Sequence, residues 1–346
     1  MKTIVLTGGG TAGHCTPHFA LLDRLNNHFD KVYYIGSEFG IEKKLVLDKG
    51  LSYFEIPTTK LKRSFSLDNL KIPFTLIKSI NEAKKILEKL NPNVVFSKGG
   101  FVGLPVTIAS KKLKIPVIVH ESDYSLGLAN KIASKFSDKT LTSFEDTAKN
   151  VKNGVYVGAP IREELFKLDR EKAIKFYGFS KHKPTLLVTG GSLGAKAINQ
   201  AVLKSLDNLL EKFNVLHIVG KNNLTPTFFK GYFQVEFTNM ELAYACADVC
   251  LSRAGSNTLF ELLALKIPTL VVPLPKAESR GDQIENTNYF YKKGVIKHLE
   301  QEELNNVNLT NELYNLYENR KAIINKLSTL NLSNGNKNIC DILTKY

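Results

Sequence analysis

Several features are scarce or missing in this sequence of 346 residues, and each absence excludes a class of protein. There are only four cysteines, none with the spacing of a metal site, which favours reduced thiols in a cytosolic protein. No apolar run reaches the roughly 18 residues of a membrane span, and the first residues show no signal-peptide pattern. Asp-x-Asp does not occur, and no cluster of His, Cys and Asp has metal-ligand spacing. We therefore expect no membrane-spanning segment, no metal ion and no other cofactor.

Acidic residues are also in deficit. The chain has 33 Asp and Glu against 47 Lys and Arg, which gives a formal net charge of +14, and the excess is larger in residues 1–158 than in the remainder. Nucleic acid, an anionic membrane surface and general solubility are the three explanations for such a charge. Because the sequence contains no nucleic-acid-binding motif, we expect no nucleic-acid partner.

The order of the elements predicts an α/β protein. Short β-branched runs alternate with helical stretches, which is typical of doubly wound parallel sheets. The chain is longer than one compact core usually holds, so we expect two domains, separated at a hinge at 158–162. The predicted strands are 3–7, 32–35, 94–96, 117–119 and 155–157 before the hinge, and 185–188, 215–219, 249–251 and 269–272 after it. We expect residues 163–177 to be helical.

Two glycine-rich turns lie about half a chain apart, each between an apolar strand and a helix. They are residues 8–14 (GGGTAGH) and 190–195 (GGSLGA). Glycine allows positive φ and a close approach of other atoms, and the N-terminus of the following helix favours an anion. Two such turns, one in each half, predict paired domains that bind a phosphorylated ligand.

The first turn has a second interpretation. Gly8, Gly10 and Gly13 satisfy Gly-x-Gly-x-x-Gly, and Glu38 ends the next strand, which together form the dinucleotide fingerprint. His14 adds a group that this fingerprint does not need. At the start of a helix its imidazole is kept neutral, so that it can accept a proton from an attacking hydroxyl. His18 lies one turn further along the same helix.

Polar residues follow two further strands of the first half. In residues 96–103 (FSKGGFVG), Lys98 stands beside two glycines, a combination suited to phosphate. Residues 120–123 (HESD) come at the carboxyl end of the next strand. That edge of a parallel sheet is where ligands bind, so these side chains are candidates for sugar or catalytic contacts.

The second half contains the most specific segment, residues 251–263 (LSRAGSNTLFELL). It predicts a strand, a turn of small residues and a helix that opens at Ser256 or Asn257. Thr258 and Glu261 are three apart and share a face of that helix. A carboxylate there can accept both hydroxyls of a ribose, while the helix N-terminus remains for a diphosphate. Further on, Gln283 and Asn286 offer neutral groups for sugar hydroxyls.

Together these motifs closely resemble the MurG family, the N-acetylglucosaminyltransferases of peptidoglycan synthesis, and the likeness runs nearly end to end. The resemblance implies the GT-B fold, which is two Rossmann-like parallel-sheet domains with a cleft between them. It assigns residues 1–160 to an acceptor-binding, membrane-facing domain and residues 161–332 to a domain that binds the UDP-sugar. A C-terminal helix at about 333–346 would pack back on the first domain.

The resemblance also implies ligands and the residues that hold them. The donor would be UDP-N-acetylglucosamine, with binding residues Thr11, Ala12, Gly13, Asp123, Arg162, Ser192, Ser256, Asn257, Thr258, Glu261 and Gln283. The acceptor would be undecaprenyl-diphospho-N-acetylmuramoyl-pentapeptide, with its diphosphate on Gly9, Gly10, Lys98, Gly99 and Gly100. Glu261 would bind the ribose hydroxyls, and Ser192 with its glycine turn would hold the donor diphosphate.

The implied reaction is a single displacement that inverts the anomeric carbon. The acceptor 4-hydroxyl attacks while one base takes its proton, and His14 is the first choice for that base, with Glu121 second. No metal ion is expected, because helix dipoles and backbone N–H groups would stabilise the leaving UDP. The basic, apolar-laced stretch 61–90 would rest on anionic lipid, which predicts a peripheral protein on the cytoplasmic face of the bacterial cell membrane.

Two other enzymes remain as alternatives. A UDP-N-acetylglucosamine epimerase of the same fold explains both halves of the chain but not the basic N-terminal face. An NAD-dependent oxidoreductase explains the first glycine turn and Glu38, but it leaves the second turn and the segment around Glu261 without a role.

Overall fold

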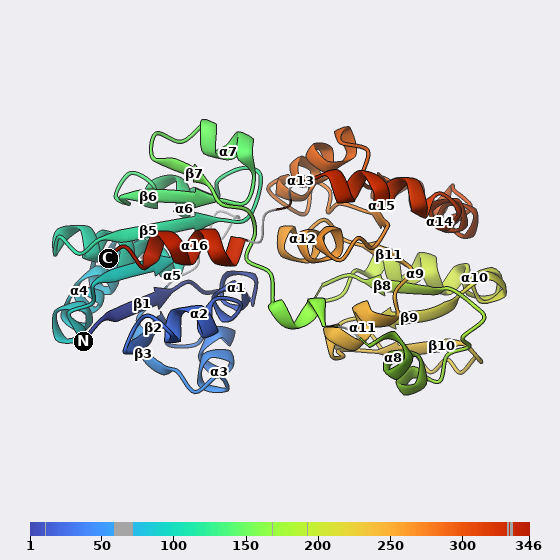
Figure 1. Cartoon of the computed structure of the whole chain (residues 1–346), viewed down its shortest axis with the longest axis horizontal. Helices are drawn as coiled ribbons and strands as arrows, with labels where there is room; N and C mark the ends of the chain where they lie inside the picture. Colours follow the sequence, from blue (N-terminus) through green and yellow to red (C-terminus); the bar gives the residue numbers. More distant parts are fainter. Residues whose placement is uncertain (11, 59–71, 168, 192, 331, 333–334) are drawn as a thin grey trace. The chain divides into compact units, whose positions relative to one another are not determined.

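The chain forms two compact units, which are described separately. In the computed structural model, the N-terminal unit comprises Met1–Arg162 together with Ser333–Tyr346, and the C-terminal unit comprises Glu163–Leu332 (Figure 1). The structure describes residues 1–10, 12–58, 72–167, 169–191, 193–330, 332 and 335–346, without the side chain of Ala12. Thr11, Ser192 and the first part of the basic stretch 61–90, all named above, lie outside the described residues.

The N-terminal unit is built on a seven-stranded parallel sheet in the order β3-β2-β1-β4-β5-β6-β7. Every residue of the inner strand β1 is buried, because helices cover both faces and a continuous apolar run is then favoured. The strands are β1 (Thr3–Thr7), β2 (Lys31–Ser37), β3 (Ser52–Ile56), β4 (Val94–Ser97), β5 (Val117–Glu121), β6 (Lys139–Thr142) and β7 (Gly154–Tyr156).

Helices pack on both faces of this sheet and give it two cores. Ile4 and Leu6 of β1 belong to one core and Val5 to the other, as the two-residue period of a strand requires. The helices are η1 (Ala12–His14), α1 (Thr16–Phe19), α2 (Leu22–Asn26), α3 (Ile41–Leu47), α4 (Ile72–Leu90), α5 (Gly100–Lys112), α6 (Leu128–Ala133) and α7 (Glu145–Lys149).

A further helix, α16 (Gly335–Leu343), joins this unit from the far end of the chain (red in Figure 1). Asn336 exchanges two hydrogen bonds with the backbone of Ile161, at 3.0 Å to its N–H and 2.6 Å to its carbonyl oxygen. Ile339 is fully buried in the core on one face of the sheet. The last residues of the chain are therefore part of the N-terminal unit.

The C-terminal unit repeats this architecture with a six-stranded parallel sheet in the order β10-β9-β8-β11-β12-β13. Its strands are β8 (Thr185–Thr189), β9 (Asn214–Ile218), β10 (Tyr232–Val235), β11 (Val249–Ser252), β12 (Thr269–Val271) and β13 (Lys297–His298). Its helices are η3 (Glu163–Phe166), α8 (Arg170–Tyr177), α9 (Lys196–Lys204), α10 (Leu206–Lys212), α11 (Met240–Cys246), α12 (Ser256–Ala264), α13 (Asp282–Lys292), η4 (Gln301–Asn305), α14 (Leu309–Glu318) and α15 (Arg320–Thr329).

All nine predicted strands are present, to within two residues at their ends, but four more were not predicted. They are β3, β10 and β13, which are edge strands, and β6, which lies next to an edge. All four carry polar residues, so their sequences lack a continuous apolar run. The helical stretch expected over 163–177 is not continuous. It is divided into η3 and α8, and the Asp169 carboxylate caps α8 by accepting from the Lys172 N–H at 3.0 Å.

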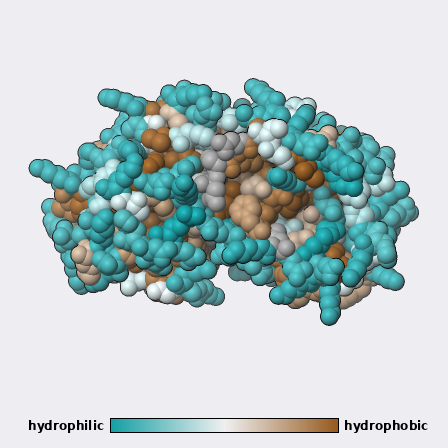
Figure 2. All heavy atoms as spheres, in the orientation of Figure 1, coloured by the Kyte–Doolittle hydropathy of each residue, from teal (hydrophilic) through white to brown (hydrophobic). Residues whose placement is uncertain are grey.

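Most large apolar residues are buried in the cores, although some, such as Phe39 and Phe228, are exposed. Hydrophilic residues cover most of the face of each unit in Figure 2, with hydrophobic patches between them. All four cysteines are buried and free. Among the described residues, no helix has both the length and the hydropathy that crossing a bilayer requires.

Candidate functional site

Three loops of the N-terminal unit leave the carboxyl edge of the sheet side by side. They follow β1, β4 and β5, and the strand order reverses between β1 and β4. Ligands of doubly wound sheets bind at such a reversal, because the helices on either side leave a crevice between the loops. The first and second of these loops are the glycine turns around Gly9 and Gly99, and the third begins after Glu121, the last residue of β5.

The first glycine turn is shaped by a buried carboxylate. A side chain at Gly9 would overlap the Glu42 carboxylate, and the Gly10 N–H donates to Glu42 Oε2 at 3.2 Å. Glu42 is fully buried and also accepts hydrogen bonds from the backbone N–H and the hydroxyl of Ser37. The Gly10 N–H, which the sequence assigned to a diphosphate, is therefore occupied within the unit. Glu38, the carboxylate of the dinucleotide fingerprint, is exposed instead.

His14 lies where the first and second loops meet. A Cβ atom added to Gly100 would come within 3.7 Å of the His14 ring and within 2.8 Å of the Gly9 carbonyl oxygen. His14 ends the short 3-10 helix η1 and does not lie on the same helix as His18, contrary to the prediction from the sequence. The helix that follows, α1, has only four residues. A one-turn helix has a small dipole, so the expected dipole support for a neutral His14 is weak.

His18 has a structural role. It is fully buried and packs edge-on against the rings of Tyr34 and Phe96, each at 5.4 Å between centroids. Burial lowers the pKa of its imidazole to about 3, so the ring is neutral at physiological pH. His18 is therefore part of the core rather than a group available to a ligand.

Lys98 points into the unit, not outward. Its ammonium lies 2.5 Å from His120 Nδ1 and donates to Ser122 Oγ at 2.6 Å, while the residue is only 2% exposed. Burial lowers the pKa of Lys98 to about 7, although the Glu121 and Asp123 carboxylates oppose that shift. As placed, the Lys98 side chain holds the loops after β4 and β5 together.

The Glu121 carboxylate also organises the third loop. Its Oε1 accepts from the N–H groups of Ser122 and Asp123 at 2.9 and 3.0 Å. Its Oε2 accepts from the Gly127 N–H at 3.0 Å and from Asn130 Nδ2 at 2.9 Å. Burial raises the pKa of Glu121, against the lowering effect of these hydrogen bonds. Four donors engage the two oxygens, so this carboxylate has little capacity left to accept a substrate proton.

The second glycine turn has the same place in the C-terminal sheet, after β8 and beside the reversal between β8 and β11. Gly191 and Gly194 both have positive φ, at +83° and +75°. A side chain at Gly194 would overlap the Val219 carbonyl, so the turn packs directly on the loop that follows β9. Asn223 Nδ2 supports it by donating to the Leu193 carbonyl at 3.1 Å.

The segment around Glu261 forms the predicted strand, turn and helix, and α12 opens at Ser256 as expected. Glu261 is half-buried, and its Oε2 accepts a hydrogen bond from the Tyr244 hydroxyl at 2.9 Å. Sequence analysis did not single out Tyr244, because a tyrosine on an amphipathic helix is an ordinary core residue. Of the other residues assigned to the donor, Asn257 and Thr258 are half-buried on α12.

Arg253 precedes α12 in the same turn, and its side chain forms hydrogen bonds within the C-terminal unit. Its guanidinium is 8% exposed and donates to the carbonyls of Val272 and Pro273, each at 3.1 Å, and to Gln301 Oε1 at 2.6 Å. These contacts join the loops after β11 and β12. Burial lowers the pKa of Arg253, while the nearby Glu278 raises it.

The two amides of α13 have different surroundings. Gln283 Oε1 accepts from the N–H groups of Ala254 and Leu274 at 3.2 and 3.0 Å. Asn286 is fully buried and donates to the Ala254 carbonyl at 3.1 Å, so the expectation that it meets a sugar hydroxyl is wrong. Gln283 is half-buried, so its amide is more accessible than that of Asn286.

The remaining predicted residues are placed as follows. Asp123 and Arg162 are half-buried and Gly13 is exposed in the N-terminal unit. In the part of the chain that the structure describes, no group of three or more His, Cys, Asp or Glu residues is arranged to hold a metal ion.

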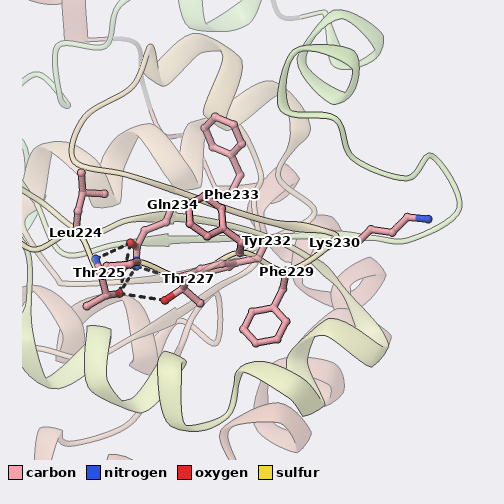
Figure 3. A pocket seen from close by; sticks show the side chains of 10 residues that line it. Leu224, Thr225, Thr227, Phe229, Lys230, Tyr232, Phe233 and Gln234 are labelled. Carbon is pink, nitrogen blue, oxygen red and sulfur yellow. Dashed lines mark hydrogen bonds between the residues drawn. The ribbon is translucent and has the colours of Figure 1, made fainter.

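A pocket that the sequence did not predict lies at the edge of the C-terminal sheet (Figure 3). It has a volume of about 690 Å³ and is lined by β10 and the loop before it, from Leu224 to Gln234. Gln234 bonds to Thr225 across this loop, with Oε1 accepting from the Thr225 N–H at 2.9 Å. None of the residues assigned to a ligand above lines this pocket.

Comparison with known proteins identifies both halves of the chain. Residues 4–142 match the glycosyltransferase family 28 N-terminal domain, and residues 185–341 match the glycosyltransferase family 28 C-terminal domain. The solved structure of MurG from Acinetobacter baumannii superposes with a TM-score of 0.76 at 22% identity and covers 100% of both chains. This likeness confirms the predicted fold class, two parallel-sheet domains of the GT-B type.

Curated relatives are similar over their whole length. UDP-N-acetylglucosamine--N-acetylmuramyl-(pentapeptide) pyrophosphoryl-undecaprenol N-acetylglucosamine transferase from Clostridium botulinum is 47% identical, over 100% of this chain and 99% of the relative. The transferase of the same name from Clostridium tetani is 46% identical, over 100% of this chain and 98% of the relative. The chain therefore belongs to glycosyltransferase family 28 and, within it, to the MurG family of N-acetylglucosaminyltransferases.

Proposed function

We propose that this chain transfers N-acetylglucosamine from UDP-N-acetylglucosamine to the 4-hydroxyl of undecaprenyl-diphospho-N-acetylmuramoyl-pentapeptide, the step that completes lipid II. The observation that carries this function is the 47% identity to a relative named for that transfer, over the whole of this chain. An epimerase or an oxidoreductase would not be expected to share this identity with the transferase through both units.

The C-terminal unit would bind the donor. Helices α9 and α12 have nine residues each, and they begin after β8 and β11, where the strand order reverses. The backbone N–H groups at the start of a helix and the helix dipole suit a diphosphate there. Glu261, one turn into α12, would accept hydrogen bonds from the ribose hydroxyls. Ser256, Asn257, Thr258 and Gln283 would line the same site. Arg162 and Ser192 would also bind the donor.

The N-terminal unit would bind the acceptor beside the loops after β1, β4 and β5. His14 would take the proton of the 4-hydroxyl as that oxygen forms its bond to the anomeric carbon, while the bond from this carbon to the UDP oxygen breaks. Attack opposite the leaving group inverts the α-linked sugar to a β-glycoside. UDP departs as an anion, so the displacement needs a base and no protonated acid. Gly9, Gly99 and Gly100 would approach the acceptor diphosphate, with Gly13 and Asp123 near the donor sugar.

The test is transfer from UDP-N-acetylglucosamine to a short-chain muramoyl-pentapeptide diphospholipid, followed by mass spectrometry. We expect a product heavier by one N-acetylhexosamine, formed equally well with an excess of chelator, because no metal-dependent step is proposed. UDP-N-acetylmannosamine produced without any acceptor would indicate epimerase activity instead. If the purified chain neither transfers the sugar nor is stabilised thermally by UDP, the proposed function is wrong.

We further propose that the N-terminal unit binds an anionic membrane surface on the cytoplasmic side, where its lipid-linked acceptor is anchored. On α4, Phe74 and Ile77 are 77% and 58% exposed, and Lys78 is exposed beside them. On α6, Leu128 is 62% exposed. Apolar side chains with flanking lysines bind an interface by burying apolar surface and by attraction to anionic lipid.

Replacing Phe74 and Ile77 together by serine should weaken binding to vesicles that contain anionic lipid by at least about tenfold, because each side chain contributes on the order of 1.5 kcal/mol or more when fully buried. Co-sedimentation with vesicles measures the partition. Phe228→Ser is the matched control, since Phe228 is 95% exposed but lies in the C-terminal unit. Equal binding of the double variant and the wild type would exclude α4 as the membrane contact.

A further inference from the structure

We propose that Tyr244 is a positioning residue, which holds the Glu261 carboxylate in the orientation that accepts the ribose hydroxyls of the donor. The inference rests on the function proposed above and adds a residue that does not itself touch the substrate. The Tyr244 hydroxyl donates to Glu261 Oε2 at 2.9 Å. Tyr244 is 3% exposed, whereas Glu261 is half-buried, so the pair extends from the interior towards the surface.

The helix that carries Tyr244 is anchored at both ends. At its start, Asn239 Oδ1 accepts from the Glu241 N–H at 2.8 Å and caps α11. At its end, Arg170 Nη1 donates to the Cys246 carbonyl at 2.9 Å, and Arg170 Nη2 pairs with Asp248 at 2.7 Å. Because α11 is fixed in this way, the phenol of Tyr244 is a fixed donor.

A glutamate side chain needs such a donor to bind a diol in one geometry. It has three rotatable bonds, and ordering them when the ligand binds costs affinity. A hydrogen bond from a phenol to a carboxylate is charge-assisted and stronger than one between neutral groups, so it selects one rotamer before the nucleotide arrives. Removing the Tyr244 hydroxyl should therefore lower the affinity only for those ligands that bind through Glu261.

The experiment compares Tyr244→Phe with Tyr232→Phe by titration calorimetry, using UDP and 2′,3′-dideoxy-UDP as ligands. Tyr232 is a matched control, because its hydroxyl is also bonded, to His217 Nδ1 and Gln234 Nε2 at 2.9 Å each, in the same unit. For Tyr244→Phe we expect the Kd of UDP to rise about three- to tenfold, less than the full value of a hydrogen bond to a charged group, because Tyr244 acts on the ligand only through Glu261. The Kd of dideoxy-UDP should not change. In the transfer reaction, the donor KM should rise with kcat unaltered.

The second measurement is the UDP affinity of the double variant Tyr244→Phe, Glu261→Gln, which tests whether the two losses of affinity add. If Tyr244 acts through Glu261, Tyr244→Phe should add almost nothing to the loss of UDP affinity in the Glu261→Gln background. An unchanged Kd for UDP, an equal loss for both nucleotides, or a fully additive double variant each overturns the inference. Transfer activity and UDP binding by the wild type separate this failure from failure of the proposed function, which would remove both. A wild type that binds UDP and dideoxy-UDP equally well overturns the ribose role of Glu261 and this inference with it, but not the transfer.

Discussion

His14→Ala should lower kcat for transfer by about 10²- to 10⁴-fold and leave the KM for the donor nearly unchanged. That range is typical of the loss of a general base, and His14 is proposed to act on the acceptor hydroxyl rather than on UDP. The placement of His14 supports the prediction, since its ring lies against Gly100 where the loops after β1 and β4 meet. Steady-state rates at saturating acceptor, with UDP affinity measured by calorimetry, would test it.

Two variants make the result specific. His182→Ala, which removes an exposed histidine of the C-terminal unit, should have no effect on kcat. Glu121→Gln should mainly reduce the free energy of unfolding, because the new amide NH₂ would face backbone N–H donors that now bond to a carboxylate. A near-wild-type kcat for His14→Ala would show that His14 is not the base. A stable Glu121→Gln protein with a greatly reduced kcat would transfer that role to Glu121.

Acidification from pH 6.5 towards pH 4 should strongly reduce the free energy of unfolding, before most carboxylates are protonated. Burial lowers the pKa of His217 to about 4 and that of His18 to about 3, and it lowers the pKa of His120 well below its usual value. In the unfolded chain these imidazoles bind a proton near pH 6.5, so the unfolded state takes up protons that the folded state excludes. The stabilisation is complete above pH 6.5 and is lost as the pH falls through the folded-state pKa values.

For His217 alone, lowering the pKa from 6.5 in the unfolded chain to about 4 in the folded chain corresponds to a loss of about 3 kcal/mol in the free energy of unfolding on acidification. The buried Glu121 has the opposite sign, because its raised pKa stabilises the folded state when the carboxyl group is protonated. Urea unfolding at a series of pH values measures the net slope. His217→Gln can still bond to Tyr232 and Asn199 but does not titrate, so its stability should approach and then exceed that of the wild type as the pH falls. Parallel curves for the two proteins would contradict this prediction.

The structure shows contacts of several predicted site residues that the sequence did not specify. Lys98, Arg253 and Asn286 were expected at ligands or in the motifs around them, yet their side chains bond within their own units. Conversely, Glu42 and Tyr244 form hydrogen bonds with the predicted site residues Gly10 and Glu261, although no local pattern singles them out. A glutamate in the first turn of a helix and a tyrosine on an amphipathic helix are ordinary residues in any sequence.

The architecture and the family could be predicted from the sequence, because both depend on patterns of neighbouring residues. A strand's apolar run, a glycine turn and a helix start each occupy fewer than about 15 neighbouring residues, and two copies of that pattern imply two parallel-sheet units. The comparisons confirm this fold and the transferase family.

Which polar side chains remain available to a ligand was decided only in the tertiary structure. Parallel pairing brings the ends of β1, β4 and β5 together, so that Lys98 meets His120, 22 residues away in sequence. In the other unit Arg253 meets Gln301, 48 residues away. Buried polar groups must find hydrogen-bond partners, and those partners come from other loops. The same requirement turned Glu42 towards the first glycine turn and Tyr244 towards Glu261, which no pattern of neighbouring residues specifies.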